Sequence, residues 1–280
     1  MTAESAATRD VARNRAAHDR LGAAYDARHP EIFNEIEQAR LRDAVARALA
    51  ELRTGSQPLR ALDVGAGTGN LTAHLLAQGV HVTAADVSAG LLAELRRRHG
   101  DRGRVETLVL NGVDLRPLPD EAFDLVAAYS VLHHVPDYAS LVVEMARVTR
   151  RSGVVYLDHE RTDESWTSRG YAEFRRRAVV WPPRRWWYYF QPSRYWKRLA
   201  PYLAWRRWRD PRWIPEGDLH VWLDDHIEWP RVEAALTRTG CEIVRRDDYL
   251  LFEPRYDRAA WEAWRAECTD TRCLVARKRP

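Results

Sequence analysis

Apolar residues along the chain follow two different spacings, and these divide it into elements. Over residues 9–25 and 32–52 they recur at helical spacing, which predicts two helices ahead of the sheet. A turn-rich segment, T-G-S-Q-P, follows at Thr54–Pro58. From Arg60 to Asp158 short apolar runs alternate with helical patterns. That order predicts parallel strands joined by right-handed crossovers.

The carboxyl-terminal third has the same two kinds of pattern after a long interruption. The interruption is an insertion over Arg161–Trp213, which leaves from a strand predicted at Val154–Asp158. The elements predicted after it are a helix at Trp229–Thr239, a strand at Glu242–Phe252, a short helix within Arg255–Glu267 and a last strand at Arg272–Ala276.

The segment Ala61–Asn70 reads A-L-D-V-G-A-G-T-G-N and is the strongest chemical signal in the chain. An apolar strand runs into three glycines, Gly65, Gly67 and Gly69, and a helical run follows. Glycines allow a tight turn and a close approach to a ligand, and a helix start offers unpaired N–H groups. The pattern predicts a nucleotide-type loop at the carboxyl end of a strand, where open α/β sheets bind ligands.

Two acidic residues indicate which ligand this loop holds. The spacing is G-x-G-x-G instead of the dinucleotide pattern G-x-G-x-x-G, and Asp63 lies at the mouth of the loop. A carboxylate there suits a cationic group better than a pyrophosphate. Asp86 ends the next apolar run, about 20 residues on, where a ribose-binding acid is expected. A turn that only packs helix on strand would explain the glycines but not both acids. S-adenosylmethionine (SAM) has an ammonium, a sulfonium, a ribose and no phosphate, and fits.

With these segments the chain resembles a class I SAM-dependent methyltransferase of the small-molecule type. The matching segments, in order, are Ala61–Asn70, Val82–Ser88, Leu118–Ala127, Val131–Asp137 and Arg147–Leu157. The resemblance implies an α/β, Rossmann-like fold with a seven-stranded, mostly parallel sheet. It also implies an N-terminal helical cap (1–56), a SAM-binding core (57–160 and 214–280) and an aromatic, arginine-rich lid insertion (161–213). The cofactor would be SAM and its product S-adenosyl-L-homocysteine.

The resemblance also implies the residues of the cofactor site. The adenine contact is open between Asn111, which we choose, and Asp114, because the segment after the third strand departs from the family pattern. The predicted cofactor-binding residues are Tyr25, Asp63, Gly65, Ala66, Gly67, Thr68, Gly69, Asn70, Asp86, Val87, Asn111, Gly112 and Tyr129.

Histidines near the same edge of the sheet are the candidate catalytic residues. His133 and His134 follow the fourth strand, and His159 follows the fifth. Imidazole is the usual general base near neutral pH. The competing interpretations are a loop-shaping role for the first two, and helix capping or surface exposure for His159. His220 and His226 come from the segment after the insertion. No recognised ligand spacing joins these groups, so no metal is predicted.

The insertion has an unusual composition that admits three interpretations. It carries 14 Lys and Arg against 4 Asp and Glu, in a chain whose net charge is +4, and seven of the twelve tryptophans lie between Trp181 and Trp213. The aromatics can be the core of a helical lid, a surface for a membrane interface, or a platform for nucleic acid. The nucleic-acid interpretation is disfavoured because no N-P-P-Y-type motif follows the fourth strand. We predict that the insertion binds the acceptor through Trp181, Trp186, Trp187 and Tyr188.

The sequence therefore predicts an enzyme that transfers a methyl group from SAM to O, N or C of a small, largely apolar, aromatic acceptor. The alternatives are a lipid or quinone methyltransferase at the membrane surface, a SAM-binding protein without methyl transfer, and an RNA-modifying enzyme that uses a SAM-derived cofactor. The first residues have no apolar signal core, and three cysteines without C-x-x-C spacing indicate reduced thiols, so a cytoplasmic location is expected. The oligomeric state is left open.

Overall fold

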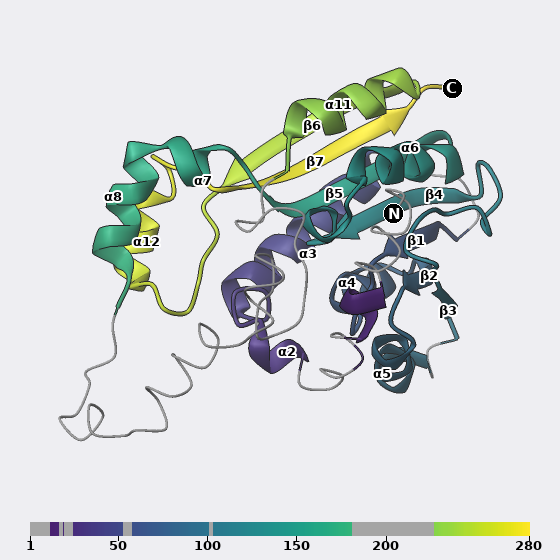
Figure 1. Ribbon diagram of the computed structural model, residues 1–280, viewed down its shortest axis with the longest axis horizontal. Coiled ribbons are helices and arrows are strands. Elements are labelled where there is room, and N and C mark those ends of the chain that lie inside the picture. The colour runs from purple at the N-terminus through teal and green to yellow at the C-terminus, as the bar shows by residue number, and fades with distance from the viewer. Residues whose placement is uncertain (1–11, 17–18, 20–24, 53–57, 101–102, 181–226) are drawn as a thin grey trace, which may run out of the picture.

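The computed structural model describes residues 12–16, 19, 25–52, 58–100, 103–180 and 227–280 of the 280-residue chain. Its centre is a seven-stranded sheet in the order β3-β2-β1-β4-β5-β7-β6 (Figure 1). β7 runs antiparallel to both of its neighbours, and the pairs from β3 to β5 are parallel. This confirms the predicted Rossmann-like α/β fold. The strands are β1 (Arg60–Val64), β2 (His81–Asp86), β3 (Val105–Val109), β4 (Phe123–Tyr129), β5 (Thr149–Arg161), β6 (Cys241–Tyr249) and β7 (Thr271–Lys278).

Helices cover both faces of the sheet (Figure 1). One face packs against α3 (Glu35–Ala50), α4 (Asn70–Ala77) and α5 (Ala89–His99), and the other against α6 (Tyr138–Val148) and α11 (Trp229–Arg238). Every residue of β4 is buried, because a central strand is covered on both sides. The predicted strands and helices of the core are thus present, with ends that shift by a few residues.

Side-chain caps explain where three of these helices begin. The carboxamide oxygen of Asn34 accepts from the Glu37 N–H at the start of α3, Ser88 caps α5, and Asp137 caps α6. The sequence places a short polar residue just ahead of each apolar stripe, so the register of each helix against the sheet is set locally.

A third, smaller core lies at one end of the molecule. α8 (Arg169–Ala178) and α12 (Arg258–Trp264) pack there around Phe174 and Trp261, and α7 (Glu164–Thr167) contacts α8. Figure 1 shows these three helices together at that end. The first part of the predicted insertion is therefore two helices, of which α8 packs on α12. The remainder of the insertion, with Trp181, Trp186, Trp187 and Tyr188, lies outside the described residues, as do His220 and His226 of the segment after it.

The N-terminal segment approaches the glycine loop. Residues 12–16 and 19 are helical, and α2 (Tyr25–Arg28) follows. Asp26 accepts a hydrogen bond from Thr68 Oγ1 at 2.7 Å and pairs with Arg98 of α5. The Asp19 carboxylate accepts from Ser88 Oγ at 2.5 Å. These contacts attach the predicted cap to the edge of the sheet where β1 and β2 end.

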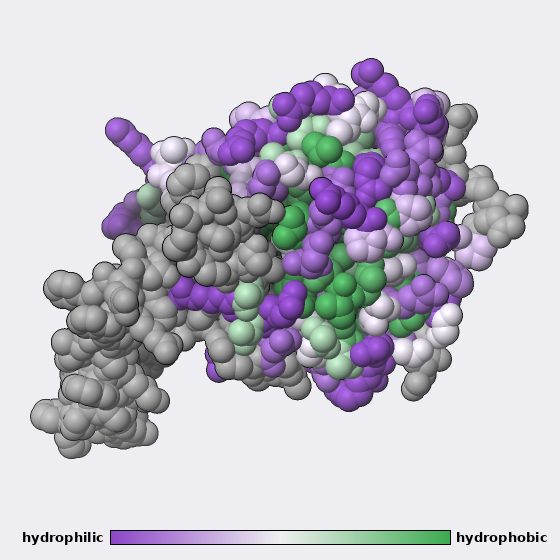
Figure 2. All heavy atoms as spheres, turned by 45° about the vertical axis from the view of Figure 1, so that its right-hand side comes forward, coloured by the Kyte–Doolittle hydropathy of each residue, from purple (hydrophilic) through white to green (hydrophobic). Residues whose placement is uncertain are grey.

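Most of the face seen in Figure 2 is hydrophilic, with a hydrophobic region at its centre beside the atoms drawn in grey. A charged surface of this kind follows from the composition, in which charged residues make up 30% of the chain. Among the described residues, no helix is both long and apolar enough to cross a bilayer.

Candidate active site

Three cavities meet at the carboxyl ends of β1, β4 and β5. Tyr25 and Ser130 line all three, so the cavities share a wall at these two residues. The first, a largely apolar cleft of about 890 Å³, extends over the ends of β2 and β3. The second, of about 390 Å³, lies against the glycine loop and the start of α4. The third, of about 870 Å³, is bordered by histidines.

The glycine loop forms the inner wall of the first two cavities. Gly65, Gly67 and Gly69 all have positive φ, of 70°, 53° and 98°. A Cβ on Gly65 would lie 2.5 Å from Val131 Cγ2, whereas a Cβ on Gly67 would meet nothing within 4 Å. Gly65 is therefore required by packing, and Gly67 faces open space on the cleft side. Ala66 and Thr68 line the second cavity, and Gly69 is the N-cap of α4.

Asp86 lies on the wall of the first cleft, together with Val87. Its Oδ2 accepts from the Gly67 N–H at 2.9 Å, and its Oδ1 accepts from the Ser88 N–H at 2.8 Å. The carboxylate is thus fixed by the glycine loop on one side and by the start of α5 on the other. A fixed acceptor at the end of β2 is compatible with the predicted contact to the two hydroxyls of a ribose.

The far end of this cleft is formed by the segment after β3. Gly112, Val113 and Asp114 line it, whereas Asn111 is not among the lining residues. The Asn111 side chain folds onto its own loop: its Oδ1 accepts from the backbone N–H groups of Val113 and Asp114, and its Nδ2 donates to Asp114 Oδ1. Asp114, the alternative adenine contact, therefore lies on the cleft wall, whereas the Asn111 amide bonds within its own loop.

The second cavity has one acidic and one amide group suited to an amino acid moiety. Asp63 is 1% exposed and accepts from Thr72 Oγ1 at 2.6 Å, and burial raises its pKa to about 7. Asn70 Oδ1 accepts from Gln38 Nε2 at 2.8 Å, while its buried Nδ2 has no partner within the described residues. An unpaired buried donor beside a buried acid is the combination that binds a carboxylate and an ammonium together.

The third cavity is bordered by His29, His133, His134 and His159, with Arg161 and Arg255. His133 Nδ1 lies 2.9 Å from Glu160 Oε2. The other oxygen of Glu160 accepts from the backbone N–H groups of Val131 and Leu132, which hold the short 3₁₀ turn Leu132–His134 in place. The three candidate catalytic histidines are therefore brought together at one cavity. His134 also lines the first cleft.

His159 differs from the other two histidines in its surroundings. Its ring stacks on Tyr129 with centroids 4.8 Å apart, and its Nε2 is buried without a partner in the part of the chain that the structure describes. Burial, followed by the charges of Arg40 and Arg161, holds the pKa of His159 well below its usual value. The imidazole is therefore neutral near pH 7. Tyr129 also lines the second cavity, and its hydroxyl donates to Glu37 at 2.9 Å.

Several residues of the site had no sequence signal. Ser130 has φ of 59°, a left-handed conformation that brings it onto the wall of all three cavities. Glu160 follows His159 in the chain, but its hydrogen bond to His133 depends on the local shape of β5. Asn14 of the N-terminal segment also lines the first cleft. A helix–strand pattern gives no information about such local backbone conformations.

Comparison with known proteins identifies the family. The family described as "Methyltransferase domain" matches residues 62–157. A demethylmenaquinone methyltransferase of Parafrankia sp. (strain EAN1pec) is 33% identical over 245 residues, which cover 79% of this chain and 84% of that protein. The chain is a SAM-dependent methyltransferase. Its cofactor is SAM, and the assignment of the first two cavities to the ribose and the amino acid moiety stays a prediction.

Other similarities place this methyltransferase more broadly. A demethylmenaquinone methyltransferase of Clavibacter sepedonicus is 35% identical over 139 residues, or 50% of this chain and 54% of that protein, so the chain spans about half its length. The solved structure of the magnesium protoporphyrin IX methyltransferase of Synechocystis, with bound S-adenosyl-L-homocysteine, has a TM-score of 0.54 at 16% identity over 95% of this chain and 99% of that one. At that identity the likeness concerns the fold. Among the described residues no cluster of metal ligands is present.

Proposed function

We propose that this methyltransferase transfers the methyl group of SAM to a small ring compound with a hydroxyl group, bound in the histidine-lined cavity. The observation that carries the proposal is the shared wall at Tyr25 and Ser130. A molecule in the third cavity lies next to the point where the adenosine and amino acid cavities join. That point is where the sulfonium of a cofactor spanning both cavities would be.

The pair formed by His133 and Glu160 supports a hydroxylated acceptor. When bound, SAM supplies an electrophilic methyl group on sulfur. Glu160 accepts from His133 Nδ1, which leaves Nε2 as the basic nitrogen of that imidazole. His133 can then take the proton of an acceptor hydroxyl as the methyl group leaves sulfur for that oxygen, and S-adenosyl-L-homocysteine is released. If a conjugated ring carbon gains the methyl group instead, that carbon loses its hydrogen as a proton and the oxygen regains one, which restores the ring. The buried Glu160 stabilises the imidazolium that forms.

The remaining residues of the cavity orient the acceptor and exclude water. Neutral His159 offers one hydrogen-bonding nitrogen, and Ile32 and Leu251 supply apolar contacts. Two of the relatives are demethylmenaquinone methyltransferases by name, which supports a quinol-type ring as the acceptor class. The predicted aromatic wall from Trp181 to Tyr188, and membrane contact through the insertion, remain predictions.

Turnover with a panel of acceptors tests the proposal. We expect S-adenosyl-L-homocysteine to form with naphthols, catechols or a demethylmenaquinone analogue, and not with amines or RNA. His133→Ala should lower kcat by about 10²–10⁴-fold, the usual contribution of a general base. His81→Ala is the matched control. His81 is exposed at the start of β2, whereas the cavities lie at the carboxyl ends of the strands.

Two results would overturn the proposal. One is acceptor-dependent turnover with RNA or phosphatidylethanolamine vesicles but with no hydroxylated ring. The other is a His133→Ala variant that keeps full turnover with a hydroxylated ring.

A further inference from the structure

β5 contains an irregularity at the acceptor site. Its pairing with β7 shifts register between Leu157 and Glu160, and His159 between them has φ of 63°. Asp158 contacts Arg40 of α3, and His159 stacks on Tyr129, whose hydroxyl binds Glu37 of α3. Both side chains thus lie on the α3 face of the sheet. A regular strand would place consecutive side chains on opposite faces, so the bulge redirects His159.

The same bulge directs Glu160 to the opposite face, where it binds His133. One local irregularity therefore places His159 on the wall of the third cavity and Glu160 beside His133. A left-handed conformation at a residue other than glycine is unfavourable and persists only where the surrounding contacts hold it.

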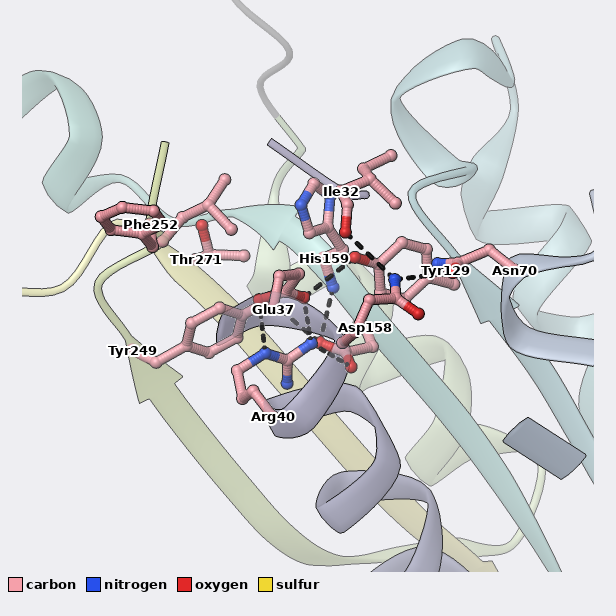
Figure 3. Close-up of polar contacts among 12 residues, drawn as sticks. Ile32, Glu37, Arg40, Asn70, Tyr129, Asp158, His159, Tyr249, Phe252 and Thr271 are labelled. Carbon is pink, nitrogen blue, oxygen red and sulfur yellow. Dashed lines mark hydrogen bonds and ion pairs between the residues drawn. The ribbon is translucent and has the colours of Figure 1, made fainter. Parts of the chain in front are cut away.

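A buried network from α3 supplies those contacts (Figure 3). Arg40 donates to both oxygens of Glu37, at 2.6 and 2.9 Å, and to Asp158 Oδ2 at 2.8 Å. Its guanidinium also lies 4.0 Å from the centre of the Tyr249 ring. Glu37 is 2% exposed and Asp158 is fully buried.

The network ends on the backbone and ring of His159. Asp158 Oδ1 accepts from the His159 N–H at 2.7 Å and from the Tyr249 hydroxyl at 3.2 Å. Asp158 Oδ2 also accepts from the Tyr156 hydroxyl. Tyr129 links the Glu37 carboxylate to the face of the imidazole.

The protonation states suit this arrangement. Burial raises the pKa of Tyr129, Tyr156 and Tyr249 well above the usual value, so the phenols remain donors. Burial acts to lower the pKa of Arg40, but Asp158, Tyr249 and Glu37 together outweigh it and the net pKa is raised. The guanidinium therefore stays charged.

We propose that Glu37 and Arg40 are positioning residues for the acceptor site, which hold His159 in the bulge through Asp158 and Tyr129. The role assigned to His159 rests on the proposed function, since it needs an acceptor in the third cavity. A buried ion pair often adds no more stability than apolar residues of similar volume. A network of this kind fixes one conformation, and here that conformation is the position of a cavity-lining imidazole.

Removing one hydroxyl tests the link through Tyr129. Tyr129→Phe keeps the ring that stacks on His159 and loses the bond to Glu37. We expect kcat to fall about tenfold with SAM affinity within a factor of two, and the imidazole NMR signals of His159 to move. Tyr138→Phe is the matched control, because Tyr138 is also buried and its hydroxyl binds a carboxylate, Glu228, on the other face of the sheet. Tyr138→Phe should change neither kcat nor the His159 signals.

Two substitutions of Arg40 separate charge from geometry. The charged or titratable groups around His159 are Arg40 of α3, Tyr129 of β4, His133 of the 3₁₀ turn, and Asp158 and Arg161 of β5. Arg40→Lys keeps the positive charge but loses the fork that binds two carboxylates. It should shift the His159 signals while the pKa of His159 stays low. Arg40→Gln, where it folds, should raise that pKa.

The outcomes distinguish this proposal from the proposed function. Unchanged His159 signals in both Tyr129→Phe and Arg40→Lys would overturn the network. An equal loss of kcat in Tyr138→Phe would do the same, since it would indicate a general loss of packing. If the wild-type protein turns over no acceptor of the panel, the proposed function fails, and the His159 spectra still decide whether α3 positions this residue.

Discussion

Replacing Asp86 by asparagine is the sharpest test of the cofactor site. The substitution keeps the size of the side chain and one of its two oxygens. In the structure the carboxylate accepts two backbone bonds, from Gly67 at 2.9 Å and from Ser88 at 2.8 Å. A ribose bound in the cleft would donate its two hydroxyls to the same carboxylate, whose oxygens only accept. The asparagine amide loses at least one of the two bonds from the ribose hydroxyls. The other bond then has an uncharged acceptor.

The expected loss follows from the strength of such bonds. A hydrogen bond to a charged group contributes about 1.5–3 kcal/mol. Losing one predicts a SAM dissociation constant that is about 10- to 150-fold higher, since 1.4 kcal/mol is a factor of ten. One backbone N–H would also face the new NH₂ group, which costs about 1–3 kcal/mol of folding stability. Binding and stability must therefore be measured separately.

Isothermal titration calorimetry with SAM measures the first effect, and thermal unfolding followed by circular dichroism measures the second. Asp43→Asn is the control, because Asp43 is an exposed residue of α3 that pairs with its neighbour Arg42. A folded Asp86→Asn protein that binds SAM within twofold of the wild type would refute the assignment of Asp86 to the ribose.

Three further predictions concern the same cavities. Gly65→Ala should destabilise the protein by about 2–5 kcal/mol, since the new Cβ adds overpacking against Val131 to left-handed strain. Gly67→Ala should cost about 1–2 kcal/mol, from left-handed strain alone. Thermal unfolding compares the two variants, and equal losses of stability would contradict the packing argument. Because burial raises the pKa of Asp63 to about 7, its carboxyl is protonated below that pH in the ligand-free protein. SAM affinity should then weaken about tenfold per pH unit below 7 and level off above it, which calorimetry across pH checks. The stability of the SAM-free protein should fall as pH rises from about 4 to 7. A flat affinity profile, or a pH-dependent one that Asp63→Asn retains, would show that Asp63 does not pair with the ammonium. Gln38→Leu frees the Asn70 amide to rotate and should weaken SAM binding about tenfold, the loss expected for one hydrogen bond between that amide and the cofactor. Gln78→Leu, at the exposed end of α4, is the control. Unchanged SAM binding in Gln38→Leu would mean that Asn70 does not contact the cofactor.

The sequence was sufficient to predict the fold because its signals are local and redundant. The three glycines and the two acids each follow an apolar run, so strand ends and loop functions could be assigned together. The strand at Val154–Asp158 was predicted too short. β5 begins at Thr149, which pairs with Phe123, and the register then shifts before Val154 pairs with Leu125. Apolar spacing does not reveal this irregularity in the polar run T-R-R-S-G.

The site was only partly predictable, for a physical reason. His133, His134 and His159 could be placed at one edge, because strand ends define that edge. The buried network beside them could not be placed. Glu37 and Arg40 lie about 120 residues before Asp158 in the chain, and the contact between Arg40 and Asp158 depends on how α3 packs on the sheet. The position of Asp114, rather than Asn111, on the cleft wall likewise depends on a loop turn that hydrogen-bonds within itself.

The position of β7 has a consequence for how this chain is made. β7 follows β6 in the sequence but lies between β5 and β6, and its Lys278 Nζ donates to the carbonyl oxygens of Ala146 and Thr149. During synthesis the edge of β5 therefore stays unpaired until residues 271–278 leave the ribosome. An unpaired strand edge is open to wrong partners. The adenosine half of the site can form early, whereas the acceptor half, which includes Thr271, waits for this final strand.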